Sequence, residues 1–147
     1  MEIVEVKREA VQPFLDREWR SANEEQFGWY EPGMWEERGH TLAAYGGGEV
    51  VGVAVFHSQG GVGRLSQLLV AASHRSKGVG GRLLARCEEI CRRDGCHKVR
   101  LITYADSQAE TFYRLHGYGR EGFLRRDIQG TDMVVMGKFL VGEEEGG

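Results

Sequence analysis

Short segments in which apolar and polar residues alternate recur along this chain, and most of them are bounded by glycine. Residues 41–45 and 49–57 follow the two-residue period of a half-buried strand, with Val51, Val53 and Val55 on one face. The glycines at 46–48 lie between these two segments and predict a hairpin. Further strands are expected at residues 2–7, 64–71, 97–104, 118–127 and 132–140.

Residues 79–93 instead have the period of an amphipathic helix. Their apolar side chains recur every three or four residues and therefore share one face: Leu83, Leu84, Cys87, Ile90 and Cys91. Gly95 supplies a stop just beyond them. On this pattern both cysteines are expected to pack in the core rather than to bind a metal.

Other helices are expected on either side of the strands. Residues 9–38 predict one or two helices, with Pro13 near the first helix start and a break at Pro32 and Gly33. Ser107 and Glu110 have the spacing of a capping box that opens a short helix through residue 115. The order of elements predicts an α/β (α+β) fold with a mixed sheet, and no second domain or repeat is visible.

Composition narrows the classes of protein that fit. The chain has 41% apolar residues, a formal net charge of -3 and no basic block, which argues against nucleic-acid binding. Apolar runs are too short to cross a membrane, no signal peptide is apparent, and three cysteines suggest a reducing compartment. We therefore expect a cytoplasmic protein with one domain over residues 1–140 and a disordered acidic tail over residues 141–147.

The segment LLVAASHRSKGVGGRLL carries the clearest chemical signal. A strand enters a glycine-rich loop that leads into a helix, so successive backbone N–H groups can converge on phosphate oxygens. Gly78, Gly80 and Gly81 leave room for a phosphate, and Arg75 and Lys77 add positive charge. Taken alone, the same pattern also fits a tight turn that packs the helix on the sheet. It is neither a Walker A loop nor a dinucleotide-binding motif.

Two motifs nevertheless give this chain a resemblance to a known family. Residues 75–80, RSKGVG, match the R/Q-x-x-G-x-G/A loop of the GCN5-related N-acetyltransferase (GNAT) superfamily. Residues 108–118, QAETFYRLHGY, resemble the A-x-x-x-Y-x-x-x-G-[FY] segment of the same family. The resemblance covers roughly residues 40–140. It implies a mixed, mostly antiparallel six- to seven-stranded sheet flanked by about four helices.

The resemblance also implies acetyl-CoA as co-substrate, with no metal. In this family the loop strand separates from the next strand, and the pantetheine arm enters the gap between them. Backbone groups of the loop strand bind the arm and the thioester oxygen, and the glycine loop binds the pyrophosphate. Asp106 occupies a position where the family often has a CoA-contacting Asn, although it could instead cap a helix. The cofactor residues implied are Leu68, Leu69, Val70, Arg75, Ser76, Lys77, Gly78, Val79, Gly80, Gly81 and Asp106.

For catalysis the resemblance implies that Tyr113 is the general acid that protonates the CoA thiolate. The alternative for Tyr113 is a packed core aromatic. Many family members carry a glutamate base near the start of the loop strand, but Ser66 and Gln67 stand there in this chain. The base is therefore left open among several acidic residues and one histidine: Glu24, Glu25, Glu31, Glu36, Glu37, His57 and Glu121.

The function implied is transfer of an acetyl group to a primary amine by direct attack in a ternary complex, with a small-molecule acceptor favoured. The aromatic and acidic segment 23–38 suits a cationic amine, or is simply an amphipathic helix. The alternatives are a protein or peptide N-acetyltransferase, a non-catalytic acyl-CoA-binding module, and a structural protein with a chance glycine loop. Edge strands within 118–140 are compatible with a homodimer.

Overall fold

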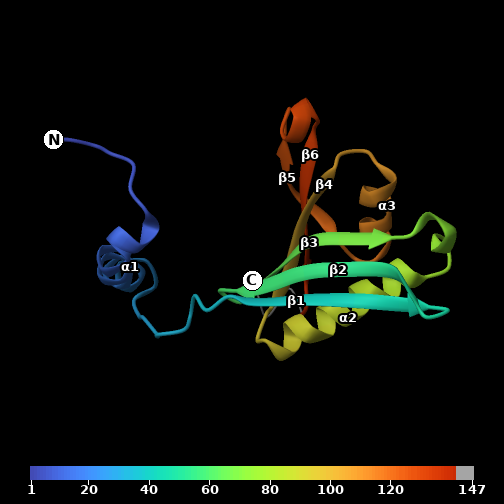
Figure 1. Ribbon diagram of the computed structural model, residues 1–147, viewed down its shortest axis with the longest axis horizontal. Coiled ribbons are helices and arrows are strands. Elements are labelled where there is room, and N and C mark those ends of the chain that lie inside the picture. The colour runs from blue at the N-terminus through green and yellow to red at the C-terminus, as the bar shows by residue number, and fades with distance from the viewer. Residues whose placement is uncertain (142–147) are drawn as a thin grey trace. The chain divides into compact units, whose positions relative to one another are not determined.

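The computed structural model describes residues 1–141, which contain three α-helices and six strands (Figure 1). The chain divides into two compact units, Met1–Trp35 and the residues from Glu36 onward. Each unit is described by itself below. The predicted single domain over residues 1–140 stays a prediction.

The first unit is built on one helix, α1 (Gln12–Phe27), which follows a 3₁₀ turn at Arg8–Val11. Pro13 lies in the first turn of α1, as expected, because its missing N–H has no intrahelical partner there. The helix ends at Gly28, whose φ of 78° is left-handed and whose N–H donates to the Glu24 carbonyl at 2.8 Å. The chain therefore leaves the helix before the break expected at Pro32 and Gly33.

The strand expected at residues 2–7 is wrong. These residues pair with no other strand, and Ile3, Val4 and Val6 are exposed. A strand requires a neighbouring strand for its backbone N–H and C=O groups, and three apolar residues in a short alternating run do not supply one.

The second unit contains one mixed sheet with the strand order β1-β2-β3-β4-β6-β5. Neighbouring strands are antiparallel except β3 and β4, which are parallel. This arrangement confirms the expected fold class at six strands. The strands are β1 (Arg38–Gly46), β2 (Glu49–Gln59), β3 (Val62–Val70), β4 (Lys98–Tyr104), β5 (Gly119–Leu124) and β6 (Met133–Phe139).

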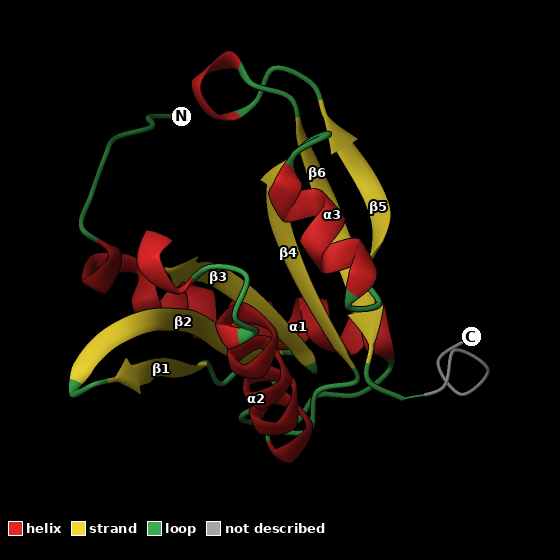
Figure 2. Cartoon of the chain, turned by 90° about the vertical axis from the view of Figure 1, so that its right-hand side faces the viewer, coloured by secondary structure: helices red, strands yellow, loops and turns green. Residues whose placement is uncertain are grey.

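Two helices of this unit, α2 (Val79–Arg93) and α3 (Gln108–Leu115), lie on the same face of the sheet (Figure 2). We call this the helix face and the opposite one the second face. Alternation along β4 shows the division, because Val99 and Leu101 are buried toward the helices whereas Arg100 and Ile102 are exposed. The prediction that Cys87 and Cys91 pack in the core is confirmed by their complete burial.

Strand β3 has two irregularities that matter for the site. Its register with β2 shifts, since Val55 pairs with Gln67 and Phe56 with Leu65, so that Ser66 forms a β-bulge. Its pairing with β4 stops after three residue pairs, the last being Arg64 with Arg100. Beyond that pair β3 and β4 diverge, as Figure 1 shows.

Residues 142–147, with the glutamate run of the expected disordered tail, lie outside the described residues. Within residues 1–141 no helix is both long enough and apolar enough to cross a membrane. The same residues contain no cluster of three or more side chains arranged to bind a metal ion.

Candidate active site

A pocket of about 580 Å³ opens on the helix face where β3, the N-terminus of α2 and α3 meet. The glycine loop and the second sequence motif, which are far apart in the chain, thus line one pocket. Its lining residues are Leu68, Val70, His74, Arg75, Ser76, Gly78, Val79, Gly80, Gly81, Gln108, Ala109, Phe112, Tyr113 and His116.

Helix α2 presents free backbone donors to this pocket. No side chain caps its N-terminus, and among the described residues the N–H groups of Val79, Gly80 and Gly81 donate to no carbonyl or side chain. Gly78, the N-cap residue, has a φ of 82°, a left-handed conformation that favours glycine. The three donors and the positive end of the helix dipole together suit an anionic group.

Two glycines also set how closely α3 approaches the loop. A Cβ atom on Gly81 would lie 2.9 Å from Nε2 of His116, and one on Gly80 would lie 3.4 Å from the Phe112 ring. The rings of Phe112 and His116 are 4.3 Å apart, and the Phe112 carbonyl holds Nδ1 of His116 at 2.8 Å. This aromatic pair lines the pocket but carried no assigned role in the sequence analysis; its i,i+4 spacing was the available signal.

The basic residues of the loop differ in position. Arg75 lines the pocket, and its Nε donates to the Val70 carbonyl at 3.3 Å. Lys77 is exposed and is not among the lining residues. The structure therefore brings Arg75, and not Lys77, to the pocket wall.

The loop strand presents alternate residues to the two faces. The side chains of Leu68 and Val70 line the pocket, whereas Leu69 is 66% exposed and pairs with Val53 on the second face. Because β4 has already diverged here, the backbone of these residues on the β4 side is not used by strand pairing. Their predicted roles, which depend on backbone groups, are compatible with this arrangement and stay predictions.

Two buried tyrosines near the pocket have different environments. The Tyr118 hydroxyl donates to Glu88 at 2.8 Å, and Lys138 donates to the same carboxylate at 2.9 Å. The Tyr113 side chain lines the pocket, and its hydroxyl has no hydrogen-bond partner among residues 1–141. Burial, with a smaller effect of nearby Cys87, raises the pKa of Tyr113 to about 12, so its hydroxyl stays protonated at neutral pH.

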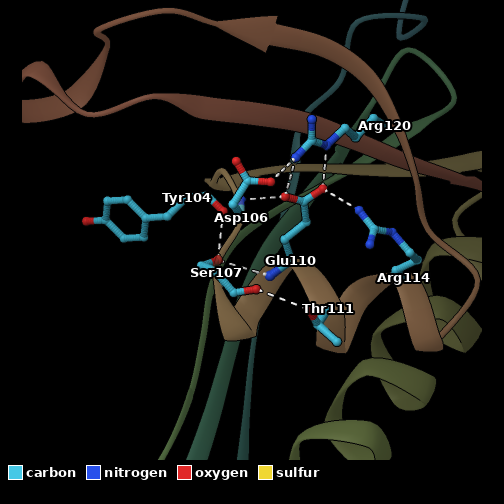
Figure 3. A network of polar contacts seen from close by, with 7 residues as sticks. All are labelled: Tyr104, Asp106, Ser107, Glu110, Thr111, Arg114 and Arg120. Carbon is cyan, nitrogen blue, oxygen red and sulfur yellow. Dashed lines mark hydrogen bonds and ion pairs between the residues drawn. The ribbon is translucent and has the colours of Figure 1, made fainter.

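A polar network fixes α3 on the sheet (Figure 3). The Ser107 hydroxyl accepts from the Glu110 N–H at 3.1 Å, which confirms the predicted N-cap. Glu110, only 1% exposed, accepts from the Asp106 N–H at 2.7 Å and from the guanidinium groups of Arg120 and Arg114. The bonds from Arg120 are the main reason that the pKa of Glu110 falls to about 2. The network holds the helix that carries Tyr113.

Asp106 lies at the edge of this network rather than in the pocket wall. Its backbone is left-handed, with a φ of 55°, and its carboxylate accepts from Arg120 at 2.9 Å. Ser107, not Asp106, caps α3. The predicted CoA contact of Asp106 stays a prediction.

The candidate bases are spread over both units. Glu24, Glu25 and Glu31 belong to the first unit, and the others to the second. His57 contacts Glu37 at 3.7 Å, and Glu121 is paired with Lys98 at 2.6 Å. Both ion pairs are on the second face, away from the pocket, and neither identifies a base.

Comparison with known proteins agrees with this geometry. The model of the "Acetyltransferase (GNAT) family" matches residues 7–118, which is more than half of the chain. The chain belongs to the acetyltransferase (GNAT) family. The resemblance drawn from the loop and the second motif is thereby confirmed.

One curated relative is an uncharacterized N-acetyltransferase, YjcF, from Bacillus subtilis (strain 168), which is 34% identical over 83 residues. That alignment covers 56% of this chain and 58% of the relative, so the chain spans less than two thirds of the relative's length.

Solved structures share the fold. An acetyltransferase from Bacillus cereus ATCC 14579 superposes with a TM-score of 0.73 at 20% identity, covering 95% of this chain and 97% of that one. A GNAT family acetyltransferase from Elizabethkingia anophelis, solved with acetyl-CoA bound, gives 0.63 at 17% identity, covering 69% and 76%. At these identities the likeness concerns the fold.

Proposed function

We propose that this protein is an acetyl-CoA-dependent N-acetyltransferase that transfers the acetyl group to a primary amine of a small molecule by direct attack in a ternary complex. One observation carries the proposal. A single pocket combines the uncapped N-terminus of α2, the basic side chain of Arg75 and the unpartnered hydroxyl of Tyr113. Family membership and the acetyl-CoA complex of the Elizabethkingia anophelis neighbour support the same reading.

The residues present fit acetyl-CoA. Val79, Gly80 and Gly81 would hold the pyrophosphate with their backbone N–H groups, and Arg75 would add charge. No side chain atom lies within 4 Å of the place where a Cβ of Gly78 would be, so a phosphate can approach the loop backbone closely. Leu68 and Val70 supply an apolar wall for the pantetheine arm, and backbone groups of residues 68–70 remain available for its amides.

Acetyl-CoA, when bound, supplies a thioester carbonyl carbon as the electrophile. Tyr113 would donate a hydrogen bond, and finally a proton, to the sulfur that leaves. A pKa of about 12 keeps the phenol protonated at every physiological pH. Low exposure of Tyr113 excludes most water, which strengthens this hydrogen bond where negative charge develops on sulfur.

Calorimetric titration with CoA and acetyl-CoA, together with a thiol-release screen of amines, tests the proposal. Gly80→Asp places a carboxylate among the free N–H groups and should weaken CoA binding at least about 100-fold, which is close to 3 kcal/mol. Arg75→Ala should weaken it about tenfold. Arg93→Ala removes an exposed cation elsewhere on α2 and should leave CoA binding unchanged.

The outcomes separate the alternatives. Binding lost in the loop variants together with thiol release supports the enzyme. Tight CoA binding without release by any amine or peptide favours the acyl-CoA-binding module. Release with peptides alone favours a protein acceptor, and no binding of acetyl-CoA at millimolar concentration overturns the proposal.

A further inference from the structure

Two arginines face each other at the closed end of the gap between β3 and β4. Arg64 and Arg100 are direct partners in the last residue pair before the strands diverge. Both follow the alternation of their strands onto the second face, because their neighbours Gly63, Leu65, Val99 and Leu101 are buried toward the helices. Like charges directly opposite each other on a sheet repel, so this arrangement is unfavourable unless an anion lies between them.

The protein does not supply that anion within residues 1–141. Neither arginine takes part in an ion pair there, and Nε of Arg64 is a buried nitrogen without a hydrogen-bond partner. Two carboxylates on the same face have other partners, Glu37 with His57 at 3.7 Å and Glu121 with Lys98 at 2.6 Å. Buried donors in native proteins are nearly always satisfied, so an unsatisfied guanidinium nitrogen suggests an external ligand.

The charge of this row of side chains also indicates the ligand. Arg64, Arg100 and Lys98 face two carboxylates, those of Glu37 and Glu121. With His57 counted as neutral, one positive charge remains. A planar guanidinium fork matches a carboxylate through two parallel hydrogen bonds, and a monoanion balances the remaining charge.

The arginines lie where an acceptor would enter. The cofactor pocket and Tyr113 occupy the helix face, so within the second unit the opposite face of the gap is the one left for the amine. Along β3 the distance from Arg64 to residues 67–68 is about 10–13 Å, part of which the arginine side chain itself spans. Leu69 and Ile102, 66% and 53% exposed, add apolar surface on either side of the gap.

We propose that Arg64 and Arg100 together bind a carboxylate of the acceptor, so that the acceptor is a small amine that also carries a carboxylate, such as a free amino acid. This inference rests on the proposed function. The amine starts as an ammonium group and first gives one proton to water. Its nitrogen then forms a bond to the acetyl carbonyl carbon, the carbon–sulfur bond breaks, and CoA leaves as a thiol with the proton of Tyr113. The nitrogen loses a second proton, which reprotonates Tyr113. Arg64 and Arg100 take no part in these bond changes and act only in binding.

Matched amines test the inference. We would measure kcat/KM by thiol release for 4-aminobutyrate against butylamine and for phenylalanine against phenethylamine. The carboxylated member of at least one pair should be at least tenfold better. Arg64→Met and Arg100→Met should each remove that advantage by raising KM for the amine at least tenfold, with KM for acetyl-CoA and the rates of the carboxyl-free amines unchanged. Arg100→Lys, which keeps the charge, should retain part of it.

Arg93→Met is the control, since Arg93 is exposed on α2 and forms no ion pair among residues 1–141. Equal rates within both pairs, or the same loss in Arg93→Met, would overturn the carboxylate site. A preference for O-phosphoethanolamine over its carboxylate analogue β-alanine would also overturn it. A preference for polyamines would instead support the cationic acceptor expected from segment 23–38.

A binding measurement keeps the inference separate from the enzyme proposal. CoA could bind while no amine releases thiol. In that case, titration of the CoA-saturated protein with the same carboxylated amines shows whether the carboxylate site exists. If the wild-type protein binds these amines and both arginine variants bind them at least tenfold more weakly, the carboxylate site is supported even without turnover. No such binding overturns it.

Discussion

Two adjacent residues of β3, Gly63 and Arg64, show how differently the two faces of the sheet are completed. On the helix face the packing is so close that a Cβ on Gly63 would lie 2.5 Å from the Cys91 sulfur. On the second face Arg64 is opposite Arg100, and one of its nitrogens is buried without a partner in the part of the chain that the structure describes. At this point of the sheet the chain itself fills the helix face, whereas the second face carries positive charge that the described residues do not neutralise.

A similar contrast separates the polar groups that the chain satisfies from those that it does not. The carboxylates of Glu88 and Glu110, under the helices, each accept from at least two donors. Groups that the protein satisfies by itself contribute to stability, and groups that it leaves unsatisfied are candidates for binding or catalysis. Four changes test this distinction.

The largest expected effect is that of Tyr113→Phe, which removes an unpartnered hydroxyl. The value of kcat should fall about 10²- to 10⁴-fold, the usual contribution of a positioned acid, with KM for acetyl-CoA and stability nearly unchanged. Tyr118→Phe is the matched control. It removes a hydrogen bond to Glu88 and should lower the free energy of unfolding by about 1–3 kcal/mol while kcat is kept. Similar kcat values for the two variants would remove Tyr113 from the mechanism.

Glu110→Gln should give the largest loss of stability. Arg120 and Arg114 are 39% and 60% exposed and can be rehydrated, so we expect about 2–3 kcal/mol by urea denaturation, less than for a fully buried pair. Because the folded pKa of Glu110 is about 2, below its ordinary value, its stabilising effect is complete above pH 5 and is lost as the pH falls toward 2. The difference in free energy of unfolding between wild type and variant should therefore shrink over that pH range. A difference that is independent of pH would contradict this role of Glu110.

Gly63→Ala should destabilise the protein by about 1–3 kcal/mol, since the new methyl group meets the Cys91 sulfur. The double variant with Cys91→Ala lacks the sulfur, so its loss of free energy of unfolding should be smaller than the sum of the losses in the two single variants. Thermal denaturation of the single and double variants measures this coupling. Additive losses would mean that the strain at residue 63 comes from another atom.

The smallest effect is expected for Arg100→Met, which removes a charge from the second face. Relief of the repulsion with Arg64 should leave stability unchanged or raise it by up to about 1 kcal/mol. The measurement is the urea midpoint without any added amine. A loss of more than about 1 kcal/mol in the free energy of unfolding would show that Arg100 has a structural partner and would contradict a role in ligand binding.

Local signals in the sequence predicted the local parts of the fold well. The expected helix 79–93 has the bounds of α2, because the amphipathic period and Gly78 and Gly95 at its ends lie within one short segment. The prediction of a strand at residues 2–7 was wrong because strand formation depends on a partner strand that is distant in the sequence. The predicted break at Pro32 and Gly33 differs less from the structure, since Gly28 ends α1 four residues before Pro32.

The residues of the candidate site also fall into those that the sequence could predict and those that it could not. The glycine loop and Tyr113 could be predicted because each belongs to a contiguous motif, and the structure brings both to one pocket. The Arg64–Arg100 pair could not, because parallel pairing joins residues 36 positions apart and only the register brings them together. Their one visible sign was an arginine within each of two strands that are otherwise rich in apolar residues.

The bulge at Ser66 makes the lining of the pocket depend on backbone geometry as well as on side-chain identity. Because Ser66 is the extra residue, Leu65 and Leu68 both face the helices although an odd number of positions separates them. If β3 kept Ser66 but paired without the bulge, strict alternation would turn Leu68 and Val70 to the second face and bring Leu69 into the pocket. One local irregularity of the backbone therefore decides which side chains of β3 face the pocket, without altering any of the residues that form it.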